Sequence, residues 1–196
     1  MKVVVASRNG HKVREIAAIF AGEGVPFELV TIDEVALGTA LIEDEDTFEA
    51  NAIVKARQAV AATGLPAIAD DSGIEVDALG GAPGVRSARY AGDPSDDSRN
   101  NAKLLAELRG VPPDRRGARY RCAAAFIDGA EVIVRSGACE GRVLEAGRGT
   151  GGFGYDPLIL IEEVGQTMAE IAPEVKNRLS HRSAAFRALA AALRTR

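Results

Sequence analysis

The stretch Val3-Val4-Val5-Ala6-Ser7-Arg8-Asn9-Gly10-His11-Lys12 decides the fold of this chain. It opens with an apolar run that is typical of a buried strand and continues into a polar loop. From Val13 to Phe20 apolar residues recur at helical spacing, and Gly22 marks the end of that segment. Strand, loop and helix in this order predict the opening of an α/β fold.

The polar loop of this stretch is suited to hold an anion. A helix start leaves backbone N–H groups unpaired and carries partial positive charge, and Ser7, Asn9 and Lys12 add donors at the same place. A phosphate is the ligand that this pattern favours. The alternative is an ordinary polar loop in which Asn9-Gly10 forms a turn.

Composition narrows the class of protein. The chain has 196 residues, of which 46% are hydrophobic, enough for one well-buried domain spanning residues 1–196. A net charge of −4 argues against binding to a nucleic-acid polymer, which normally needs a basic excess. The first apolar run is too short for a signal peptide and no segment approaches membrane-spanning length, so we expect a cytoplasmic protein without a membrane partner. Cys122 and Cys139 lack metal-ligand spacing and are interpreted as reduced, buried thiols.

The following segments place further polar residues at predicted strand and helix ends. A strand is predicted over 27–30, and a helix over 48–62 with Thr47 as its N-cap. In that helix Asn51 and Lys55 lie one turn apart on one face. A short buried strand over 67–69 runs into Asp70-Asp71-Ser72-Gly73, so both carboxylates are expected at the C-terminal edge of the sheet, where α/β folds keep their chemistry.

The second half of the chain predicts an antiparallel part of the sheet. Apolar runs over 122–127 and 132–134 flank Asp128-Gly129, a strong hairpin signal. A strand is predicted over 158–161, and the last helix follows Ser180 as N-cap. The predicted fold is therefore an α/β fold with a mixed sheet flanked by helices.

Some motifs in the chain are misleading. Residues 147–152 match G-x-G-x-x-G, but they open onto Pro157 and a strand instead of a helix, which argues against a dinucleotide-binding loop. The chain has no P-loop and no nucleophile-elbow motif.

The chemistry is therefore expected from carboxylates: Glu43 and Asp71 are hard oxygen ligands suited to Mg²⁺, while lysines and arginines neutralise phosphate. Each of these groups also has an ordinary reading as a solvated charge, a turn or a core residue.

Taken together and in order, the motifs resemble those of the inosine/xanthosine triphosphate pyrophosphatases, which remove non-standard purine nucleotides from the nucleotide pool. The resemblance runs from residue 7 to residue 182. The matching segments are Ser7 to Lys12, Phe48 to Arg57, Ala69 to Gly73, Gly80 to Gly84, Ser87 to Tyr90, Gly151 to Pro157, and Lys176 with Ser180 to Arg182.

This resemblance implies a homodimeric, Mg²⁺-dependent enzyme that splits dITP, ITP or XTP into the monophosphate and pyrophosphate. It implies an elongated mixed sheet in two lobes with a central substrate cleft. Asp71 is then the proton acceptor and a metal ligand, and Glu43 the second metal ligand. The residues implied in substrate binding are Ser7, Arg8, Asn9, Gly10, His11, Lys12, Lys55, Ser72, Phe153, Gly154, Tyr155, Asp156, Lys176, His181 and Arg182.

Two points stay open at this stage. Glu45 is an alternative to Glu43 as second ligand, and Ala50 stands where many relatives carry an acidic residue. The rival functions are a nucleotide sensor that does not hydrolyse and a related pyrophosphatase with another base preference. The carboxylates Glu43 and Asp71 favour the enzyme, and Ser180-His181-Arg182 favours 6-oxopurines, because donors in that turn would be left unpaired by the 6-amino group of adenine.

Overall fold

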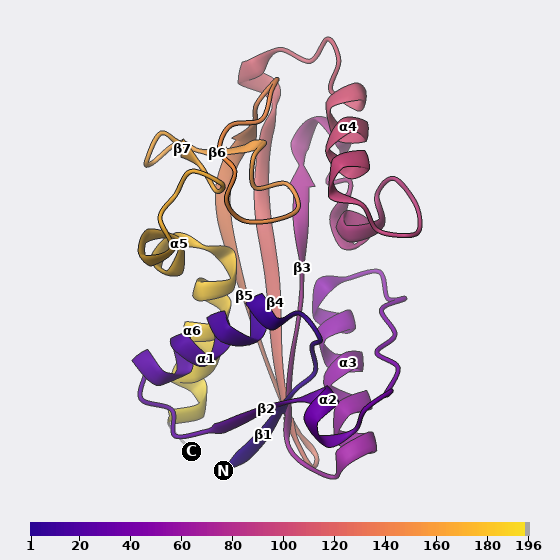
Figure 1. Ribbon diagram of the computed structural model, residues 1–196, viewed down its shortest axis with the longest axis vertical. Helices are drawn as coiled ribbons and strands as arrows, with labels where there is room; N and C mark the ends of the chain where they lie inside the picture. The colour runs from indigo at the N-terminus through magenta and orange to yellow at the C-terminus, as the bar shows by residue number, and fades with distance from the viewer. Residues whose placement is uncertain (195–196) are drawn as a thin grey trace. The chain divides into compact units, whose positions relative to one another are not determined.

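A computed structural model describes residues 1–194, except for the side chains of His11 and Pro173. The strands form one sheet in the order β2-β1-β3-β4-β5-β6-β7 (Figure 1). Their bounds are β1 (Lys2–Val5), β2 (Glu28–Thr31), β3 (Ala67–Val76), β4 (Gly117–Asp128), β5 (Glu131–Val143), β6 (Ile159–Ile161) and β7 (Gln166–Thr167). Strand β1 pairs in parallel with β2 and β3, whereas β6 is antiparallel to both β5 and β7. The predicted mixed α/β sheet is confirmed.

Helices occupy the segments between the strands and the end of the chain. The α-helices are α1 (Gly10–Gly22), α2 (Ile32–Val35), α3 (Phe48–Thr63), α4 (Asp97–Glu107), α5 (Pro173–Leu179) and α6 (His181–Arg194), and the 3-10 helices are η1 (Asp77–Leu79), η2 (Gly84–Arg89) and η3 (Pro113–Arg115). Thr47 caps α3 as predicted, since its side chain accepts a hydrogen bond from the Ala50 N–H. No helix in the part of the chain that the structure describes is long and apolar enough to cross a membrane.

The chain divides into two compact units. Unit 1 comprises Met1–Asp71, Cys122–Gly137 and the segment from His181 onward; unit 2 comprises Ser72–Arg121 and Ala138–Ser180. Each unit has its own hydrophobic core. In unit 1 the core gathers around Phe20, Phe126 and Phe186, and in unit 2 around Leu104, Ile159 and Met168.

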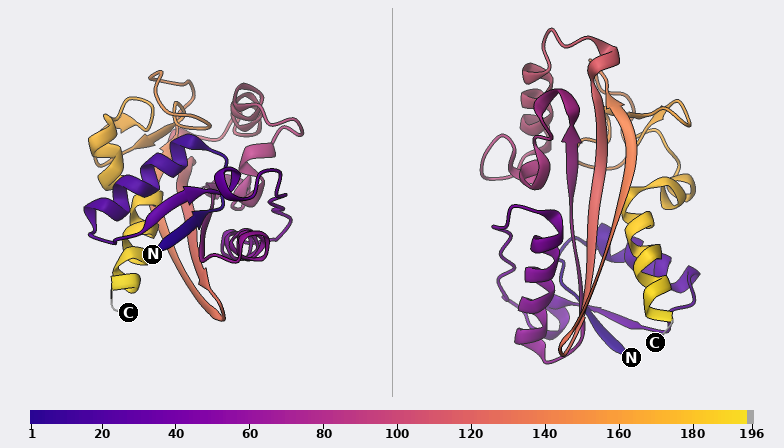
Figure 2. Two further views of the ribbon diagram at one scale, coloured as in Figure 1. Left: turned by 60° about the horizontal axis from the view of Figure 1, so that its bottom comes forward. Right: turned by 180° about the vertical axis from the view of Figure 1, so that it is seen from behind.

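Within unit 1 the helices cover both faces of the strands. Helix α3 lies on one face, and α1 and α6 lie on the other (Figures 1 and 2). One face of α6 is apolar and buried, with Phe186 and Leu189 fully inaccessible. The two faces of these strands therefore offer two separate environments for polar side chains.

The prediction that Asp70-Asp71-Ser72-Gly73 forms a loop at a strand end is wrong. Strand β3 continues through these residues to Val76. Its partner β1 stops early, because the last pair is Val5 with Ile68. Asp70 and Asp71 therefore lie inside β3 but beyond the last residue pair of β1 with β3. The strand that ends next to the two aspartates is β1, whereas the sequence predicted that β3 ends there.

Other boundaries differ from the predictions by a few residues. Helix α1 begins at Gly10, so Gly10 to Lys12 form its first turn instead of a loop. Strands β4 and β5 are longer than their apolar runs and are joined by Gly129 and Ala130, where Gly129 has a φ of 57°. The glycine-rich segment 147–152 leads through turns into β6, as the argument against a dinucleotide-binding loop requires.

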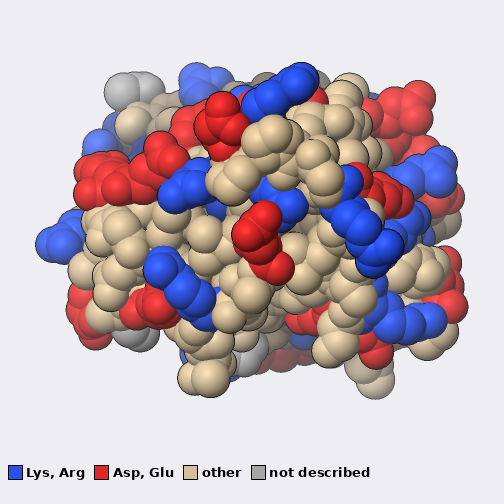
Figure 3. Space-filling model, turned by 90° about the horizontal axis from the view of Figure 1, so that it is seen from above, with Lys and Arg blue, Asp and Glu red and all other residues tan. Residues whose placement is uncertain are grey.

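Charged side chains are distributed without a single dominant sign on the face drawn in Figure 3, where Lys and Arg alternate with Asp and Glu. This mixture agrees with the net charge of −4. Any basic binding site must therefore be local, and it has to be identified from individual side chains.

Candidate functional site

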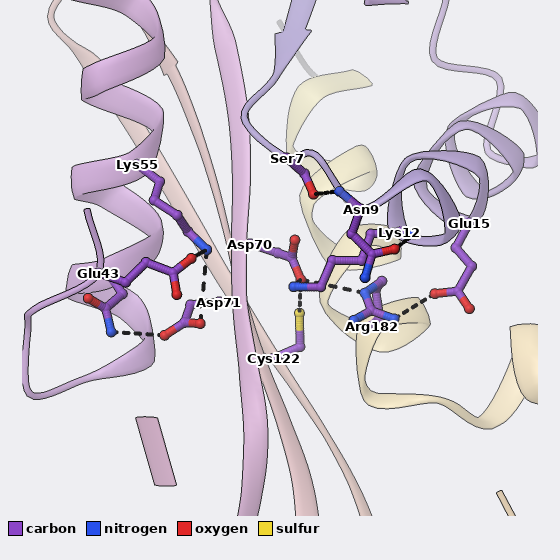
Figure 4. Close-up of polar contacts among 11 residues, drawn as sticks. Ser7, Asn9, Lys12, Glu15, Glu43, Lys55, Asp70, Asp71, Cys122 and Arg182 are labelled. Carbon is purple, nitrogen blue, oxygen red and sulfur yellow. Dashed lines mark hydrogen bonds and ion pairs between the residues drawn. The ribbon is translucent and has the colours of Figure 1, made fainter. Parts of the chain in front are cut away.

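The loop after β1 is fixed by its own polar side chains. Ser7 Oγ accepts a hydrogen bond from the Asn9 N–H at 3.1 Å, and Asn9 Oδ1 accepts one from the Lys12 N–H at 3.2 Å. Asn9 thus satisfies one of the unpaired donors at the start of α1. The capped first turn directs the Lys12 side chain from α1 toward β3 (Figure 4).

Asp70 and Asp71 point to opposite faces of β3, because successive side chains of a strand alternate (Figure 4). Asp70 faces α1 and α6, and Asp71 faces α3. Each aspartate is the centre of a cluster. We call Lys12, Glu15, Asp70, Cys122 and Arg182 the Asp70 cluster, and Glu43, Asn51, Lys55 and Asp71 the Asp71 cluster.

The Asp70 cluster is a charge network around two buried groups, Asp70 and Arg182. Asp70 Oδ2 lies 3.0 Å from Lys12 Nζ and 3.5 Å from Arg182 Nε, and Arg182 Nη1 lies 2.6 Å from Glu15 Oε2. Burial disfavours the ionised form of Asp70, yet the opposing attraction of Lys12, Arg182 and Lys55 holds its pKa far below the usual range. Asp70 is therefore a fixed anion that anchors two cations.

The Asp71 cluster has a different balance. Lys55 Nζ lies 2.5 Å from Glu43 Oε1 and 4.0 Å from Asp71 Oδ1. The pKa of Asp71 is raised because burial and the Glu43 charge outweigh the opposing effects of Lys55 and Asn51. Lys55 itself has a raised pKa, since the attraction of Asp70, Glu43 and Asp71 overcomes the burial that would lower it. The carboxylates of Glu43 and Asp71 therefore share one lysine, Lys55 of α3.

Asn51 orders this cluster, and its contacts distinguish Glu43 from Glu45, the two candidates for the second metal ligand. Its Nδ2 donates to Asp71 Oδ2 at 2.9 Å, and its Oδ1 accepts from the Glu45 N–H at 3.0 Å. Asn51 thus binds the main chain of Glu45, while the side chain of Glu43 reaches Lys55. This arrangement favours Glu43 over Glu45 as a partner of Asp71.

The donor set of the Asp71 cluster fits a hard cation such as Mg²⁺. Among the residues that the structure describes there is no group of three or more His, Cys, Asp or Glu side chains able to hold a metal by themselves. Mg²⁺ is commonly held by one or two carboxylates together with substrate phosphates and water. Glu43 and Asp71 are such a pair, since both approach Lys55 Nζ.

Unit 2 contains a third group, which we call the Asp156 cluster: Tyr120, Phe153, Asp156 and Lys176. Asp156 is 4% exposed, and its Oδ1 accepts from the Tyr120 hydroxyl at 2.9 Å. Its Oδ2 accepts from the Phe153 N–H at 3.1 Å and from Lys176 Nζ at 2.8 Å. Lys176 Nζ also lies 5.4 Å from the centre of the Phe153 ring, which is 43% exposed. The cluster presents an exposed aromatic face beside an ammonium group.

The other predicted site residues lie outside the three clusters. Arg8 pairs with Asp33 at 3.1 Å, and the Gly154 N–H donates to Asp97 at 2.7 Å. The Tyr155 hydroxyl donates to the Ser87 carbonyl at 2.8 Å. Ser72 is half-buried in β3 directly after Asp71, and His181 is buried at the start of α6. The side chain of His11, also predicted, lies outside the described residues.

The sequence did not reveal Glu15 and Tyr120. Glu15 follows Lys12 by one helical turn, a weak signal that places both on one face of α1. Its partner Arg182 is 167 positions away, and the partner of Tyr120, Asp156, is 36 positions away. Neither spacing carries local periodicity, so the pairs appear only in the folded chain.

Sequence comparison extends these observations. The pattern of the Ham1 family matches residues 3–192. The chain belongs to the Ham1 family. The match begins in β1 and ends in α6, so it includes the residues of all three clusters.

Individual Ham1 relatives are similar over nearly their whole length. A protein of Geobacter sulfurreducens named dITP/XTP pyrophosphatase is 50% identical over 186 residues, which cover 94% of this chain and 92% of the relative. The solved structure of a HAM1 protein from Coxiella burnetii matches with a TM-score of 0.92 and 35% identity, with 100% of each chain covered. The Ham1 protein of Staphylococcus aureus has a TM-score of 0.90 and 36% identity, covering 100% of this chain and 99% of its own.

Proposed function

We propose that this chain hydrolyses non-standard purine nucleoside triphosphates, dITP, ITP or XTP, to the monophosphate and pyrophosphate. The 50% identical relative from Geobacter sulfurreducens, a dITP/XTP pyrophosphatase, supports the substrate class. The Asp71 cluster supports the chemistry, because it combines two carboxylates and a buried lysine at one face of β3. This juxtaposition is the observation that carries the proposal.

Asp71 is the proposed proton acceptor. Attack of water on the α-phosphorus needs a base that orients the water, and Asn51 holds the Asp71 carboxylate at 2.9 Å in a defined orientation. Glu43 and Asp71 are the proposed ligands of Mg²⁺. Bound there, the ion would neutralise negative charge on the triphosphate.

The phosphate side of the substrate is assigned to the cations and donors around β1 and α3. Lys12 and Lys55 supply positive charge, and the start of α1 supplies N–H groups. The proposed contacts in this part are Ser7, Arg8, Asn9, Gly10, His11, Lys12 and Lys55, whereas Ser72 is assigned chiefly to the base and sugar end. In the described chain Lys12 is paired with Asp70 and Lys55 with Glu43. A bound triphosphate would therefore take the place of a carboxylate as the anionic partner of each lysine.

The base side is assigned to residues with aromatic faces and donors. Phe153 offers a stacking surface, and Lys176 offers an ammonium next to it. Gly154, Tyr155 and Asp156 hold that segment in place, and His181 with Arg182 is the proposed reader of the 6-oxo group. The amino group of adenine would leave such donors unpaired, which disfavours ATP.

Further properties are proposed from the family resemblance alone. These are a single pyrophosphatase domain over residues 1–196, a homodimer and a location in the cytoplasm. Light scattering on a sizing column measures the mass directly, and a monomeric mass would refute the homodimer.

The test is a product analysis with Mg²⁺ and dITP, run beside dGTP and dATP. Pyrophosphate and dIMP from dITP, with little product from the other two, are the expected result. Orthophosphate and the diphosphate would mean that another phosphorus is attacked. Binding of dITP without turnover would favour a nucleotide sensor instead.

A further inference from the structure

One buried carboxylate in unit 2 connects β4 to the proposed base site. Asp156 Oδ1 accepts a hydrogen bond from the Tyr120 hydroxyl at 2.9 Å. Asp156 Oδ2 accepts from the Phe153 N–H at 3.1 Å and from Lys176 Nζ at 2.8 Å. Tyr120 lies on β4 and is 5% exposed, whereas Phe153 is 43% exposed. The Tyr120 hydroxyl is therefore linked through Asp156 to the two groups that are proposed to contact the base.

The Tyr120 hydroxyl sets the direction of the Asp156 carboxylate. Rotation about the terminal bond of an aspartate side chain is soft, so the backbone alone does not fix where each oxygen points. The bond to Tyr120 occupies Oδ1 and leaves Oδ2 facing the Phe153 N–H and Lys176. The preceding turn packs closely on this carboxylate, because Gly152 has a φ of 74° and a Cβ there would collide with Asp156. A change in the direction of the carboxylate would therefore disturb the turn that carries Phe153.

The Tyr120 hydroxyl is a permanent and well-placed donor. Burial and the Asp156 charge raise the pKa of Tyr120 well above its ordinary value of 10.0, so the hydroxyl keeps its proton at neutral pH. An ionised carboxylate only accepts hydrogen bonds, so the phenol must donate to it. The Tyr120 ring packs in the hydrophobic core of unit 2, which fixes the position of the hydroxyl, whereas the Lys176 ammonium sits on a flexible stem. Tyr120 is thus the rigid partner of this carboxylate.

We infer that Tyr120 is a positioning residue of the base site: through Asp156 it fixes the Phe153 ring and the Lys176 ammonium for contact with the purine. The inference rests on the proposed function, because Phe153 and Lys176 are assigned to the base there. Without the hydroxyl, Oδ1 loses a buried donor and the carboxylate can turn. Oδ2 then no longer holds its two donors in one arrangement, so the binding energy of the purine is partly spent on ordering them.

The experiment compares Tyr120→Phe with the matched control Tyr90→Phe. Each variant removes one hydroxyl that donates to a carboxylate of unit 2, that of Asp156 or of Glu107, and keeps the aromatic ring. Calorimetry measures the affinity for two probes in the presence of Mg²⁺: dIMP, which carries the base, and tripolyphosphate, which does not. Tyr120→Phe is expected to weaken dIMP binding about tenfold, the effect of one hydrogen bond to a charged group. Its affinity for tripolyphosphate should stay unchanged, and Tyr90→Phe should change neither affinity.

Two further measurements separate positioning from a general loss of structure. With dITP as substrate, Tyr120→Phe should raise KM about tenfold and leave kcat unchanged, because the lost interaction is made equally in the ground state and the transition state. If Tyr120 acts through Asp156, the double variant Tyr120→Phe/Asp156→Asn should bind dIMP no more weakly than Asp156→Asn alone. If Tyr120→Phe does not fold, Tyr120→Met carries the same test, since methionine fills the space without a strong donor.

The outcomes distinguish this inference from the proposed function. Unchanged dIMP affinity in Tyr120→Phe, equal losses for dIMP and tripolyphosphate, or additive losses in the double variant would each overturn the positioning role. The proposed function survives these results as long as the wild-type protein releases pyrophosphate from dITP. A wild-type protein that binds dIMP without releasing pyrophosphate from dITP would refute the hydrolysis and leave the role of Tyr120 standing. A wild-type protein that does not bind dIMP would refute the base site and, with it, the inference.

Discussion

Two neighbouring aspartates of β3 have opposite electrostatic environments. Asp70 is surrounded by cations that lower its pKa, whereas burial and Glu43 raise the pKa of Asp71. Their sequence positions differ by one, but the alternation of a strand sends them to different faces. The two residues therefore differ in their surroundings: Asp70 contacts Lys12 and Arg182, and Asp71 is the proposed proton acceptor.

Asp71→Asn is expected to lower kcat by about 10²–10⁴-fold, the usual contribution of a positioned acid or base. The amide retains the size of the side chain and accepts no proton from water. The melting temperature should stay near that of the wild type, which a thermal scan measures. The exposed Asp114 offers a matched control, Asp114→Asn, with unchanged kcat. Full activity in Asp71→Asn would remove this residue from the mechanism.

The thiol of Cys139 makes the free energy of unfolding depend on pH in the alkaline range. Burial, together with Glu140 and Glu163, raises the pKa of its thiol to about 11, above the ordinary value of 9.0. Above pH 9 the unfolded chain loses this proton while the folded chain keeps it, so the folded state binds more protons there. The stabilising effect is complete below pH 9 and is lost as the pH rises toward 11.

The free energy of unfolding should therefore decline between pH 9 and pH 11, and less steeply in Cys139→Ala. Denaturant titrations at several pH values measure both slopes. Equal slopes in the variant and the wild type would show that Cys139 does not contribute to this dependence.

At the scale of elements, the start of α3 controls the Asp71 cluster. Asn51 and Lys55 lie on this helix, and Thr47 caps it by accepting the Ala50 N–H at 3.1 Å. Thr47→Ala is expected to cost about 1 kcal/mol of stability and to lower the melting temperature by about 2–4 °C. Because the frayed turn precedes Asn51 directly, kcat should fall as well.

Thr31→Ala is the matched control, because Thr31 caps the short helix α2 in the same way. It should lower the melting temperature without changing kcat, since α2 carries none of the cluster residues. A loss of kcat in Thr31→Ala that equals the loss in Thr47→Ala would show that the effect follows stability and not the position of α3.

Strand β5 and helix α6 approach each other closely at Gly137. A Cβ at this position would meet the His181 carbonyl, the Ala185 nitrogen and the Ala184 Cβ at less than 3.0 Å. Two of these atoms are backbone, so they cannot yield by rotating a side chain. Gly137→Ala should destabilise the protein by about 1–3 kcal/mol, as overpacking does. Gly22→Ala at the end of α1 meets no atom within 4 Å and should be neutral or stabilising. Equal melting temperatures of the two variants would contradict this packing argument.

At the scale of the whole molecule, local patterns predicted the elements but not their long-range partners. Apolar periodicity located β1, α3 and α6, and the Asp128-Gly129 signal located the hairpin within one residue. The continuation of β3 through Asp70 to Gly73 was missed, because polar residues within a long strand resemble a turn when the neighbouring strands are unknown. Glu15 with Arg182 and Tyr120 with Asp156 were missed because such pairs depend on tertiary packing.

Dependence on a divalent cation separates activity from folding. In unit 1 Glu43 and Asp71 already face Lys55, so their charges are partly compensated before any cation binds. EDTA should therefore abolish pyrophosphate release from dITP while changing the melting temperature by less than about 2 °C, because a weakly bound ion adds little stability. Added Mg²⁺ should restore the activity. Turnover that persists in EDTA would refute the proposed role of Mg²⁺, and a large fall in melting temperature would mean that a metal ion supports the fold, as structural metals do.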